Sequence, residues 1–468
     1  MKNLSLMHYN SHDTIAAIAT PLGVGGIAVI RISGPSAFAC ADSVFRGNTS
    51  AVNAPSHTIH YGTIADPVSR GTIDTVLLSV FRTPHSFTGE DVVEISSHGG
   101  YFVSQRILSL LYKNGSRPAE PGEFTLRAFM NGKMDLAQAE AVADIIHSKT
   151  EKSHKASIEQ LSGKLSQSVQ SLRQEILNIS SLLELELDFS QEGIELADKG
   201  LVVEKLTSIE NSIRNLSSSY QEGKMIREGI KVALVGKPNA GKSSLLNVLL
   251  REERAIVSDI PGTTRDTIAE SVLLDGIEFI FNDTAGLRDS TDTVELEGIK
   301  RTGAAISNSD IVLIVIDSSM PISKEDTLIY SSISSECVKR GGHAAWIFNK
   351  NDLSGTSAAT SESFPNISIS CKSHEGISEL KTMLRGIALP HHDSSSSSIT
   401  ITNIRHKDAL DRALTSIGAA KRTIEDGLGG DFASVDLRGA LNFLGEIIGL
   451  TTPDDILNNI FSNFCIGK

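Results

Sequence analysis

The sequence has few cysteines and no long hydrophobic run. Its four cysteines, Cys40, Cys337, Cys371 and Cys465, lie far apart in 468 residues. This usage predicts neither a disulfide framework nor a zinc-type pairing, and it fits a reducing cytosol. Apolar runs such as residues 311–316 are far shorter than the ~20 residues that span a bilayer. With no apolar core before a small-residue cleavage site near the start, the sequence predicts a cytoplasmic protein without a membrane partner.

Basic residues are outnumbered by acidic ones. The 43 Lys and Arg against 56 Asp and Glu give a net charge of −13, which argues against indiscriminate binding of DNA or RNA through bulk charge. A local basic groove stays compatible with this balance. The 40% hydrophobic and 21% charged fractions are ordinary for a globular protein and argue against disorder of the whole chain. The length favours about three domains.

Hydrophobic periodicity separates a mixed N-terminal part from a helical part. Residues 1–133 contain short runs rich in Val and Ile, typical of strands, and one helical stretch at 104–113. In residues 134–228 the apolar residues recur every three to four positions, which predicts helices. One apolar stripe on a long helix is predicted from Leu161, Leu165, Val169, Leu172, Ile176, Ile179 and Leu183. Packing against other helices is favoured over a lipid surface, because residues 136–228 hold 10 basic and 15 acidic residues.

The second half of the chain has an alternating helix and strand pattern first and a helical pattern at its end. Residues 229–389 alternate helices with near-continuous apolar runs, which are typical of buried parallel strands. A polar, Ser-rich linker follows, and residues 390–468 become helical again. The sequence therefore predicts a multidomain α/β plus all-α protein. In its simplest architecture, a Ras-like α/β unit is inserted between two halves of one helical domain.

A phosphate-binding motif begins this inserted unit. Residues 236–243 fit G-x-x-x-x-G-K-[ST] without a mismatch, after a predicted strand and before a predicted helix. Backbone N–H groups of such a loop and of the helix N-terminus face the phosphates of a nucleotide. Lys242 is expected to neutralise the β- and γ-oxygens, and the Ser243 hydroxyl to hold Mg²⁺.

Four further elements follow in the order expected of a GTPase. Thr263 and Thr264 can offer a hydroxyl to Mg²⁺, and Asp283 with the N–H of Gly286 can sense the metal and the γ-phosphate. The Asp352 carboxylate can accept two N–H bonds from guanine, an arrangement that adenine cannot match. GTP is therefore expected rather than ATP, and the set resembles translation-factor-like GTPases. The predicted GTP contacts are Asn239, Ala240, Gly241, Lys242, Ser243, Ser244, Ser258, Asp259, Ile260, Pro261, Gly262, Thr263, Thr264, Asp283, Thr284, Ala285, Gly286, Asn349, Lys350, Asp352, Ser370, Cys371 and Lys372.

The group that positions the attacking water is left open by these motifs. Leu287 stands where Ras-like enzymes carry a water-orienting glutamine, so another residue has to take this role. The following acids can do so or can simply be solvated surface charges: Asp289, Asp292, Glu295 and Glu297. Asn239 can coordinate a monovalent cation together with carbonyls of residues 258–263, or it can merely fill the loop.

Several longer blocks of the sequence are similar to those of one particular GTPase family. PHSFTGEDVVEISSHGG, GKPNAGKSSLLN, DTAGLRDSTDTVE and the terminal FCIGK resemble the MnmE (TrmE) family of tRNA-modification GTPases. The resemblance implies an N-terminal domain similar to tetrahydrofolate-binding aminomethyltransferase domains, which dimerises and binds 5-formyl-tetrahydrofolate or a related one-carbon folate. It also implies that the homodimer and an FAD-containing partner, MnmG, form a heterotetramer. Together they modify carbon 5 of the wobble uridine of certain tRNAs with an aminomethyl or carboxymethylaminomethyl group, and K⁺ stimulates the GTP hydrolysis that this needs.

The same resemblance assigns roles to single positions. It implies K⁺ ligands at Asn239, Ser258, Ile260 and Thr263, Mg²⁺ ligands at Ser243 and Thr264, and a catalytic role for Glu295. The motif chemistry described above adds Lys242 and Gly286 to the expected catalytic residues. It implies folate contacts at Arg31, Glu94, Lys133 and Lys468, where Lys468 has to reach back to the N-terminal domain. Cys465 belongs to the terminal motif, and its role stays open between chemistry and apolar packing.

Two other classes of GTPase fit the sequence less well. A ribosome-assembly or signalling switch that binds RNA usually carries a module rich in Lys and Arg, whereas the helical part here is acidic. A membrane-remodelling GTPase needs an apolar or basic membrane-binding element, which the sequence lacks. The favoured reading further predicts that GTP and K⁺ order residues 258–264, pair two GTPase domains and move the helical domain.

Overall fold

The computed structural model describes residues 13–188, 198–252, 269–282, 309–353, 364–388, 399–427 and 430–468. Contacts divide the chain into two compact units. The first unit holds Met1–Ile146, Glu159–Ile213 and Ala409–Lys468, and the second holds His147–Ile158 and Arg214–Asp408. The division falls inside four helices, which are α4 (Leu136–His147), α5 (Glu151–Leu161), α7 (Lys199–Ser218) and α13 (Ile404–Glu425).

The first unit begins with a seven-stranded sheet in the order β3-β4-β5-β6-β2-β1-β7. Its strands are β1 (Thr14–Ile18), β2 (Ile27–Ser33), β3 (Phe45–Gly47), β4 (Thr58–Ala65), β5 (Thr72–Phe81), β6 (Val92–His98) and β7 (Ser116–Pro118). Neighbouring strands are antiparallel except β1 and β7, which are parallel. Strands β1, β2, β4, β5 and β6 confirm the predicted Val- and Ile-rich strands, and the helical stretch predicted at 104–113 is confirmed as α2 (Tyr101–Lys113). The short elements α1 (Ala37–Val44), β3, β7 and α3 (Glu123–Met130) were missed, because each is too brief for a period to stand out.

The two faces of this sheet differ in character. Helices α1 and α2 cover one face, where Ile30, Ile32 and Ile95 are fully buried. The alternation of a strand turns Arg31 and Glu94 to the other face, where the register sets them directly opposite each other on β2 and β6. Helix α3 packs on this second face through Phe124, beside Ile15 and Ala17 of β1.

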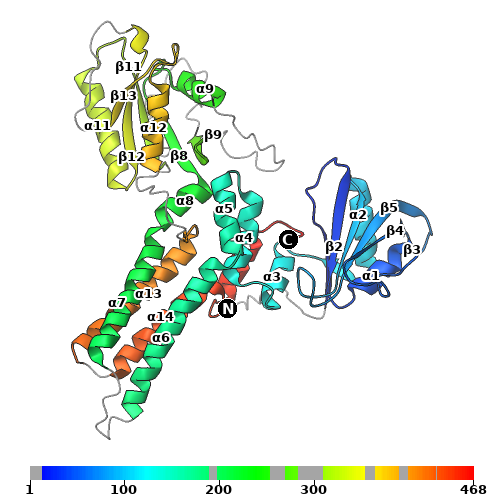
Figure 1. Ribbon diagram of the computed structural model, residues 1–468. Helices are drawn as coiled ribbons and strands as arrows, with labels where there is room; N and C mark the ends of the chain where they lie inside the picture. Colours follow the sequence, from blue (N-terminus) through cyan, green and yellow to red (C-terminus); the bar gives the residue numbers. More distant parts are fainter. Residues whose placement is uncertain are drawn as a thin grey trace, which may run out of the picture. The chain divides into compact units, whose positions relative to one another are not determined.

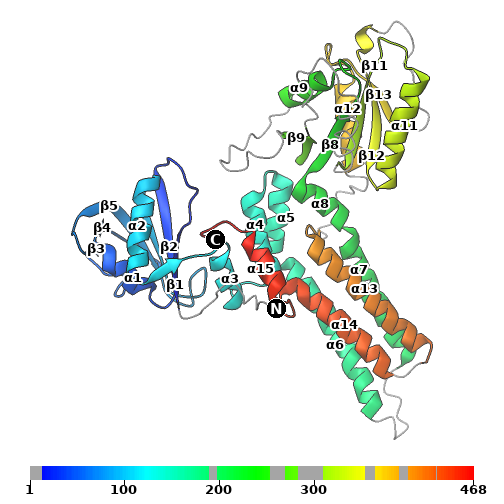
Figure 2. The same cartoon turned by 180° about the vertical axis from the view of Figure 1, so that it is seen from behind.

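The helical part of the first unit joins segments from both sides of the inserted region. Helices α6 (Lys164–Asp188) and α14 (Gly430–Ile448) run side by side, as Figure 2 shows. The predicted stripe is confirmed from Leu165 to Leu183, whose members are buried. Leu161 was wrongly placed on the same helix: it ends α5 (Glu151–Leu161), because Gly163 turns the chain with a φ of +84°. Helices α4 and α15 (Asp454–Ser462) also belong to this part, as do most of α7 and α13.

The second unit contains a six-stranded sheet in the order β13-β12-β11-β8-β10-β9. Its strands are β8 (Ile230–Val235), β9 (Ala269–Leu274), β10 (Ile277–Asn282), β11 (Ile311–Asp317), β12 (His343–Asn349) and β13 (Asn366–Ser368). The predicted parallel pairing is confirmed, and β9, which was missed, pairs antiparallel with β10. β13 is only half-buried rather than fully buried as predicted, because it forms the edge of the sheet.

Helices cover both faces of this parallel sheet. Helices α9 (Lys242–Glu252) and α12 (Ile377–Ala388) pack on one face and α11 (Lys324–Lys339) on the other, as Figure 1 shows. α8 (Tyr220–Glu228) leads into β8. In such a fold the loops after the carboxyl ends of the strands form the ligand-binding edge. None of the helices within the described ranges is both long and apolar enough to cross a bilayer.

Candidate active site

The phosphate-binding loop connects β8 to α9, as the motif predicts. Strand β8 ends at Val235 and α9 begins at Lys242. Gly241 has a φ of +99°, and a Cβ atom there would lie 2.0 Å from Nδ2 of Asn349. Only glycine therefore lets the loop approach the end of strand β12 this closely. Asn239 has a φ of +63°, which asparagine tolerates better than most residues, and it is exposed.

Lys242 lies inside the curve of this loop. Its Nζ donates to the carbonyl oxygens of Gly236 at 2.7 Å and Lys237 at 2.9 Å. Burial lowers the pKa of Lys242 below its ordinary value. These bonds hold the ammonium group at the carbonyl-lined centre of the loop, while Ser243 and Ser244 are exposed in the first turn of α9. A phosphate seated there meets a held cation and the positive end of a helix dipole.

Asn349 connects three motifs that are far apart in the sequence. Its side-chain Nδ2 donates to the carbonyl of Ala240 at 2.9 Å, and its Oδ1 accepts the backbone N–H of Cys371 at 3.2 Å. The residue is only 2% exposed. Asn349 thus fixes the position of the base-binding loops relative to the phosphate-binding loop.

The residues around the predicted guanine site form a second set of contacts. Lys350 has a φ of +66°, and its Nζ pairs with Oδ2 of Asp317 at 2.5 Å. Burial alone would raise the pKa of Asp317, but hydrogen bonds from Lys350 and Ser319 lower it below its ordinary value. Asp352 is exposed and accepts a hydrogen bond from Ser370 at 2.7 Å. Asp317 was missed by the sequence analysis, although an acid ending an apolar strand run is a signal that could have found it.

Cys371 and Lys372, which follow Ser370 in the second base-binding loop, differ in their exposure to solvent. Burial raises the pKa of the Cys371 thiol to about 11, so this cysteine stays protonated at neutral pH. Lys372 is exposed. The contacts of Asn349 with Ala240 and Cys371, and of Asp352 with Ser370, therefore bring the phosphate-binding loop and the two base-binding loops together.

The remaining predicted nucleotide and metal contacts lie outside the described residues. They are Ser258, Asp259, Ile260, Pro261, Gly262, Thr263, Thr264, Asp283, Thr284, Ala285, Gly286 and Glu295, together with the other acids after Leu287.

A second cluster lies on the open face of the N-terminal sheet. Nε and Nη2 of Arg31 both lie 2.8 Å from Oε1 of Glu94. Nη1 of Arg31 donates to the carbonyl of Gly467 at 3.4 Å, so the C-terminal tail reaches this sheet. Burial and the Arg31 cation lower the pKa of Lys468, against the opposing effect of Glu94. Arg31, Glu94 and Lys468 are therefore neighbours.

Two other predicted residues lie at the margin of this cluster. Lys133 is exposed, and its Nζ donates to the carbonyl of Pro84 at 3.0 Å rather than to the cluster. Cys465 is exposed, and its carbonyl accepts the N–H of Gly122 at 3.4 Å. Of the two roles left open for Cys465, packing as a small buried side chain does not fit, because the residue is exposed.

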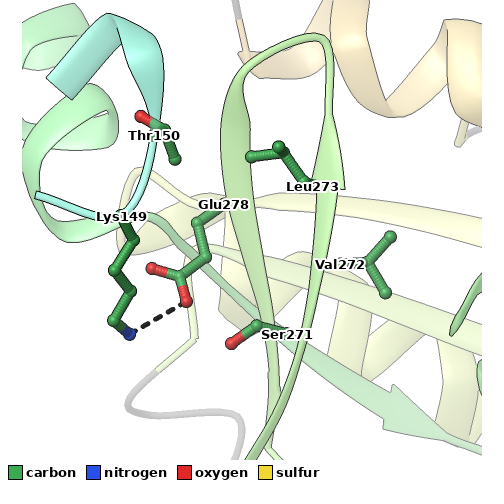
Figure 3. A pocket seen from close by; sticks show the side chains of 6 residues that line it. All are labelled: Lys149, Thr150, Ser271, Val272, Leu273 and Glu278. Atoms are coloured by element: carbon green, nitrogen blue, oxygen red, sulfur yellow. Dashed lines mark hydrogen bonds and ion pairs between the residues drawn. The ribbon is translucent and has the colours of Figure 1, made fainter. Parts of the chain in front are cut away.

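A hollow in the second unit lies away from the nucleotide-binding edge. Figure 3 shows its lining residues, Lys149, Thr150, Ser271, Val272, Leu273 and Glu278, with an ion pair of 2.9 Å between Lys149 and Glu278. Glu278 lies at the beginning of β10, next to the beginning of the parallel strand β8. The phosphate-binding loop follows the opposite end of β8, so this hollow is not part of the nucleotide site.

Fold and site together define the class of the second unit. A glycine loop between strand and helix, a lysine held within it and an N-K-x-D loop at the same edge of a parallel sheet form the active site of a P-loop GTPase. A sequence profile described as "GTP-binding protein TrmE N-terminus" matches residues 14–133, and one described as "MnmE helical domain" matches residues 136–465. The chain belongs to the MnmE family of tRNA modification GTPases.

Full-length relatives agree with this assignment. A tRNA modification GTPase MnmE of Carboxydothermus hydrogenoformans is 43% identical over 464 residues, covering 97% of this chain and 99% of the relative. One of Flavobacterium psychrophilum is 44% identical over 466 residues, covering 98% and 99%. Among solved structures, the G domain of the T. maritima FeoB iron transporter is 24% identical, covers 34% of this chain and 98% of its own, and has a TM-score of 0.25.

Proposed function

We propose that this chain is a K⁺-stimulated GTPase that modifies carbon 5 of the wobble uridine of certain tRNAs together with an FAD-containing MnmG subunit. The product group is of the aminomethyl or carboxymethylaminomethyl type, and 5-formyl-tetrahydrofolate or a related folate supplies the one-carbon unit. The observation that carries the proposal is that one chain holds both a GTPase site and the cluster of Arg31, Glu94 and Lys468.

The metal ions in this proposal bind at the phosphate-binding loop. Ser243 is exposed in the first turn of α9, where its hydroxyl can serve as a Mg²⁺ ligand with Thr264 as the second protein ligand. The exposed Asn239 is the proposed K⁺ ligand, with carbonyls of Ser258, Ile260 and Thr263 completing the shell. K⁺ supplies positive charge beside the phosphates, and Glu295 positions the attacking water.

The folate site in this proposal is the cluster on the N-terminal sheet. Two cations, Arg31 and Lys468, match an anionic glutamate tail, and the Glu94 carboxylate can accept N–H bonds from a pterin ring. The chemistry of the donors therefore fits the ligand. Lys133 contributes from the edge of the cluster, beside the loop at Pro84.

The proposal extends to assembly and domain organisation. The chain forms a homodimer through its N-terminal domain, joins MnmG in a heterotetramer, uses tRNA as substrate and works in the cytoplasm. Its domains are residues 1–133, the helical halves 134–228 and 390–468, and the GTPase domain 229–389. The packing of α6 against α14 supports joining the two helical halves.

Reconstitution of the modification tests this function. The purified chain, its FAD-containing partner, GTP, 5-formyl-tetrahydrofolate and unmodified tRNA are combined, and the modified nucleoside is measured by mass spectrometry. Modification is expected to require GTP and to be lost in Lys242→Ala and in Arg31→Ala, but not in Lys339→Ala, which removes an exposed lysine of α11. Full modification without GTP, or by Lys242→Ala, would contradict the proposal.

A further inference from the structure

Two aromatic rings flank the guanidinium group of Arg31. The guanidinium carbon lies 5.2 Å from the ring centre of Phe87 and 5.6 Å from that of Phe124. The Arg31 side chain is 13% exposed. An arginine held over aromatic faces is attracted by the negative ring quadrupoles and loses rotational freedom. The position of Arg31 is therefore set by these two rings as well as by Glu94.

Both rings are themselves held by a buried network of charges. Arg127, which is fully buried, donates to both carboxylate oxygens of Glu90 at 3.1 Å and to Oδ1 of Asp13 at 2.6 Å. Glu90 follows Phe87 in the same loop, so this contact fixes the loop. Arg127 also donates to Glu123, which precedes Phe124 in α3, at 3.1 Å.

A second set of contacts holds the Phe87 loop directly. Nδ2 of Asn131 donates to the carbonyl of Thr88 at 2.8 Å, and the Ser33 hydroxyl bonds with the Thr88 hydroxyl at 2.7 Å. Thr88 is fully buried. Phe87 is thus anchored by its immediate neighbour in the chain, and its half-buried ring stays against Arg31.

The pairing of Arg31 with Glu94 has an unusual form. Arginine commonly binds a carboxylate through two parallel bonds that use both oxygens. Here Nε and Nη2 both approach the single oxygen Oε1. Within the described part of the chain, Oε2 of Glu94 has no hydrogen-bond partner.

We propose that Phe87 and Phe124 are positioning residues that hold Arg31 on one oxygen of Glu94 and keep the other oxygen available to a ligand. The inference rests on the proposed folate function, since the ligand it serves is a pterin whose N–H groups donate to Glu94. An unrestrained Arg31 would pair with both oxygens and remove the free acceptor. The two rings therefore raise the affinity for the folate without touching it.

A double-mutant cycle separates this role from a general effect on folding. Phe87→Leu keeps an apolar side chain and removes the aromatic face, and we expect binding of 5-formyl-tetrahydrofolate to weaken about three- to tenfold. Phe87→Tyr restores the face and the affinity. In an Arg31→Gln background, Phe87→Leu should cause no further loss, because the ring acts only through the guanidinium group. The matched control is Phe102→Leu, since Phe102 is 78% exposed on α2.

Binding is measured with the full chain by isothermal titration calorimetry, using 5-formyl-tetrahydrofolate as the ligand. If the wild-type chain does not bind it, the proposed folate function fails. If the wild-type chain binds and Arg31→Gln weakens binding, but Phe87→Leu binds like Phe102→Leu, the positioning role is wrong. It is equally wrong if Phe87→Leu weakens binding by the same factor in the Arg31→Gln background, because a merely structural residue would do this.

Discussion

Replacing Asn349 by alanine should destabilise the second unit as well as weaken nucleotide binding. The amide side chain satisfies the carbonyl of Ala240 and the N–H of Cys371, and it is 2% exposed. A buried polar group that loses its partner costs about 1–3 kcal/mol. Asn349→Ala leaves two such groups, the Ala240 carbonyl and the Cys371 N–H, so the expected loss in the free energy of unfolding is about 2–6 kcal/mol.

The chain contains a natural probe for this measurement. Its single tryptophan, Trp346, lies in the same strand as Asn349, is 3% exposed and donates to Ser334 at 3.0 Å. Urea denaturation followed by Trp346 fluorescence therefore reports on the second unit alone. Lys372→Ala, at an exposed position of the same region, serves as the control and should stay within about 0.5 kcal/mol of the wild type.

The variant Asn349→Asp tests whether the N–H donor of the Asn349 amide is needed. The carboxylate keeps an acceptor for Cys371 but places a second acceptor against the carbonyl of Ala240, so it should destabilise at least as much as alanine does. If Asn349→Ala unfolds at the wild-type urea concentration and yet binds GTP poorly, the residue acts on the nucleotide directly. The reasoning that it joins the loops would then be refuted.

Three further outcomes follow from the same geometry. Asp352→Asn should lose affinity for GTP in equilibrium binding while its Trp346 unfolding curve stays near that of the wild type, and unchanged GTP affinity would remove Asp352 from the base site. Since the pKa of Asp317 is lowered below 3.8, its charged form stabilises the fold above that pH and the stabilisation is lost on acidification. Asp317→Asn should thus be less stable at pH 7, with a difference that shrinks as urea midpoints are measured at lower pH; a constant difference would contradict this. In thiol titration of the native chain, only the exposed Cys465 should react quickly, because burial raises the pKa of Cys40, Cys337 and Cys371; a fast phase that persists in Cys465→Ser would be inconsistent with this.

The long or strongly patterned elements could be predicted from the sequence. Buried parallel strands such as β11 read as continuous apolar runs, and the stripe on α6 repeats every three to four residues over many turns. Element ends were less certain, since Leu161 was assigned across the turn at Gly163. A single glycine inside a helical pattern does not reveal a break unless its conformation is known.

The phosphate and base motifs could be predicted because their chemistry requires adjacent residues. Contacts between distant residues could not. Nothing in the sequence indicates that Asn349 contacts Ala240, that Asp317 pairs with Lys350, or that Phe87 stacks on Arg31. These pairs depend on sheet register and loop conformation, which sequence spacing alone does not determine.

The rate of GTP hydrolysis in K⁺ and in Na⁺ at equal ionic strength decides whether this chain is a K⁺-stimulated GTPase. The wild-type chain is compared with Lys242→Ala, Asn239→Ala and Glu295→Ala, with ATP as the control nucleotide. We predict hydrolysis of GTP but not ATP, stimulation by K⁺ that Asn239→Ala removes, and almost no hydrolysis by Lys242→Ala or Glu295→Ala. Equal rates in the two salts, or hydrolysis that survives Lys242→Ala, would contradict the proposed K⁺-stimulated GTPase activity.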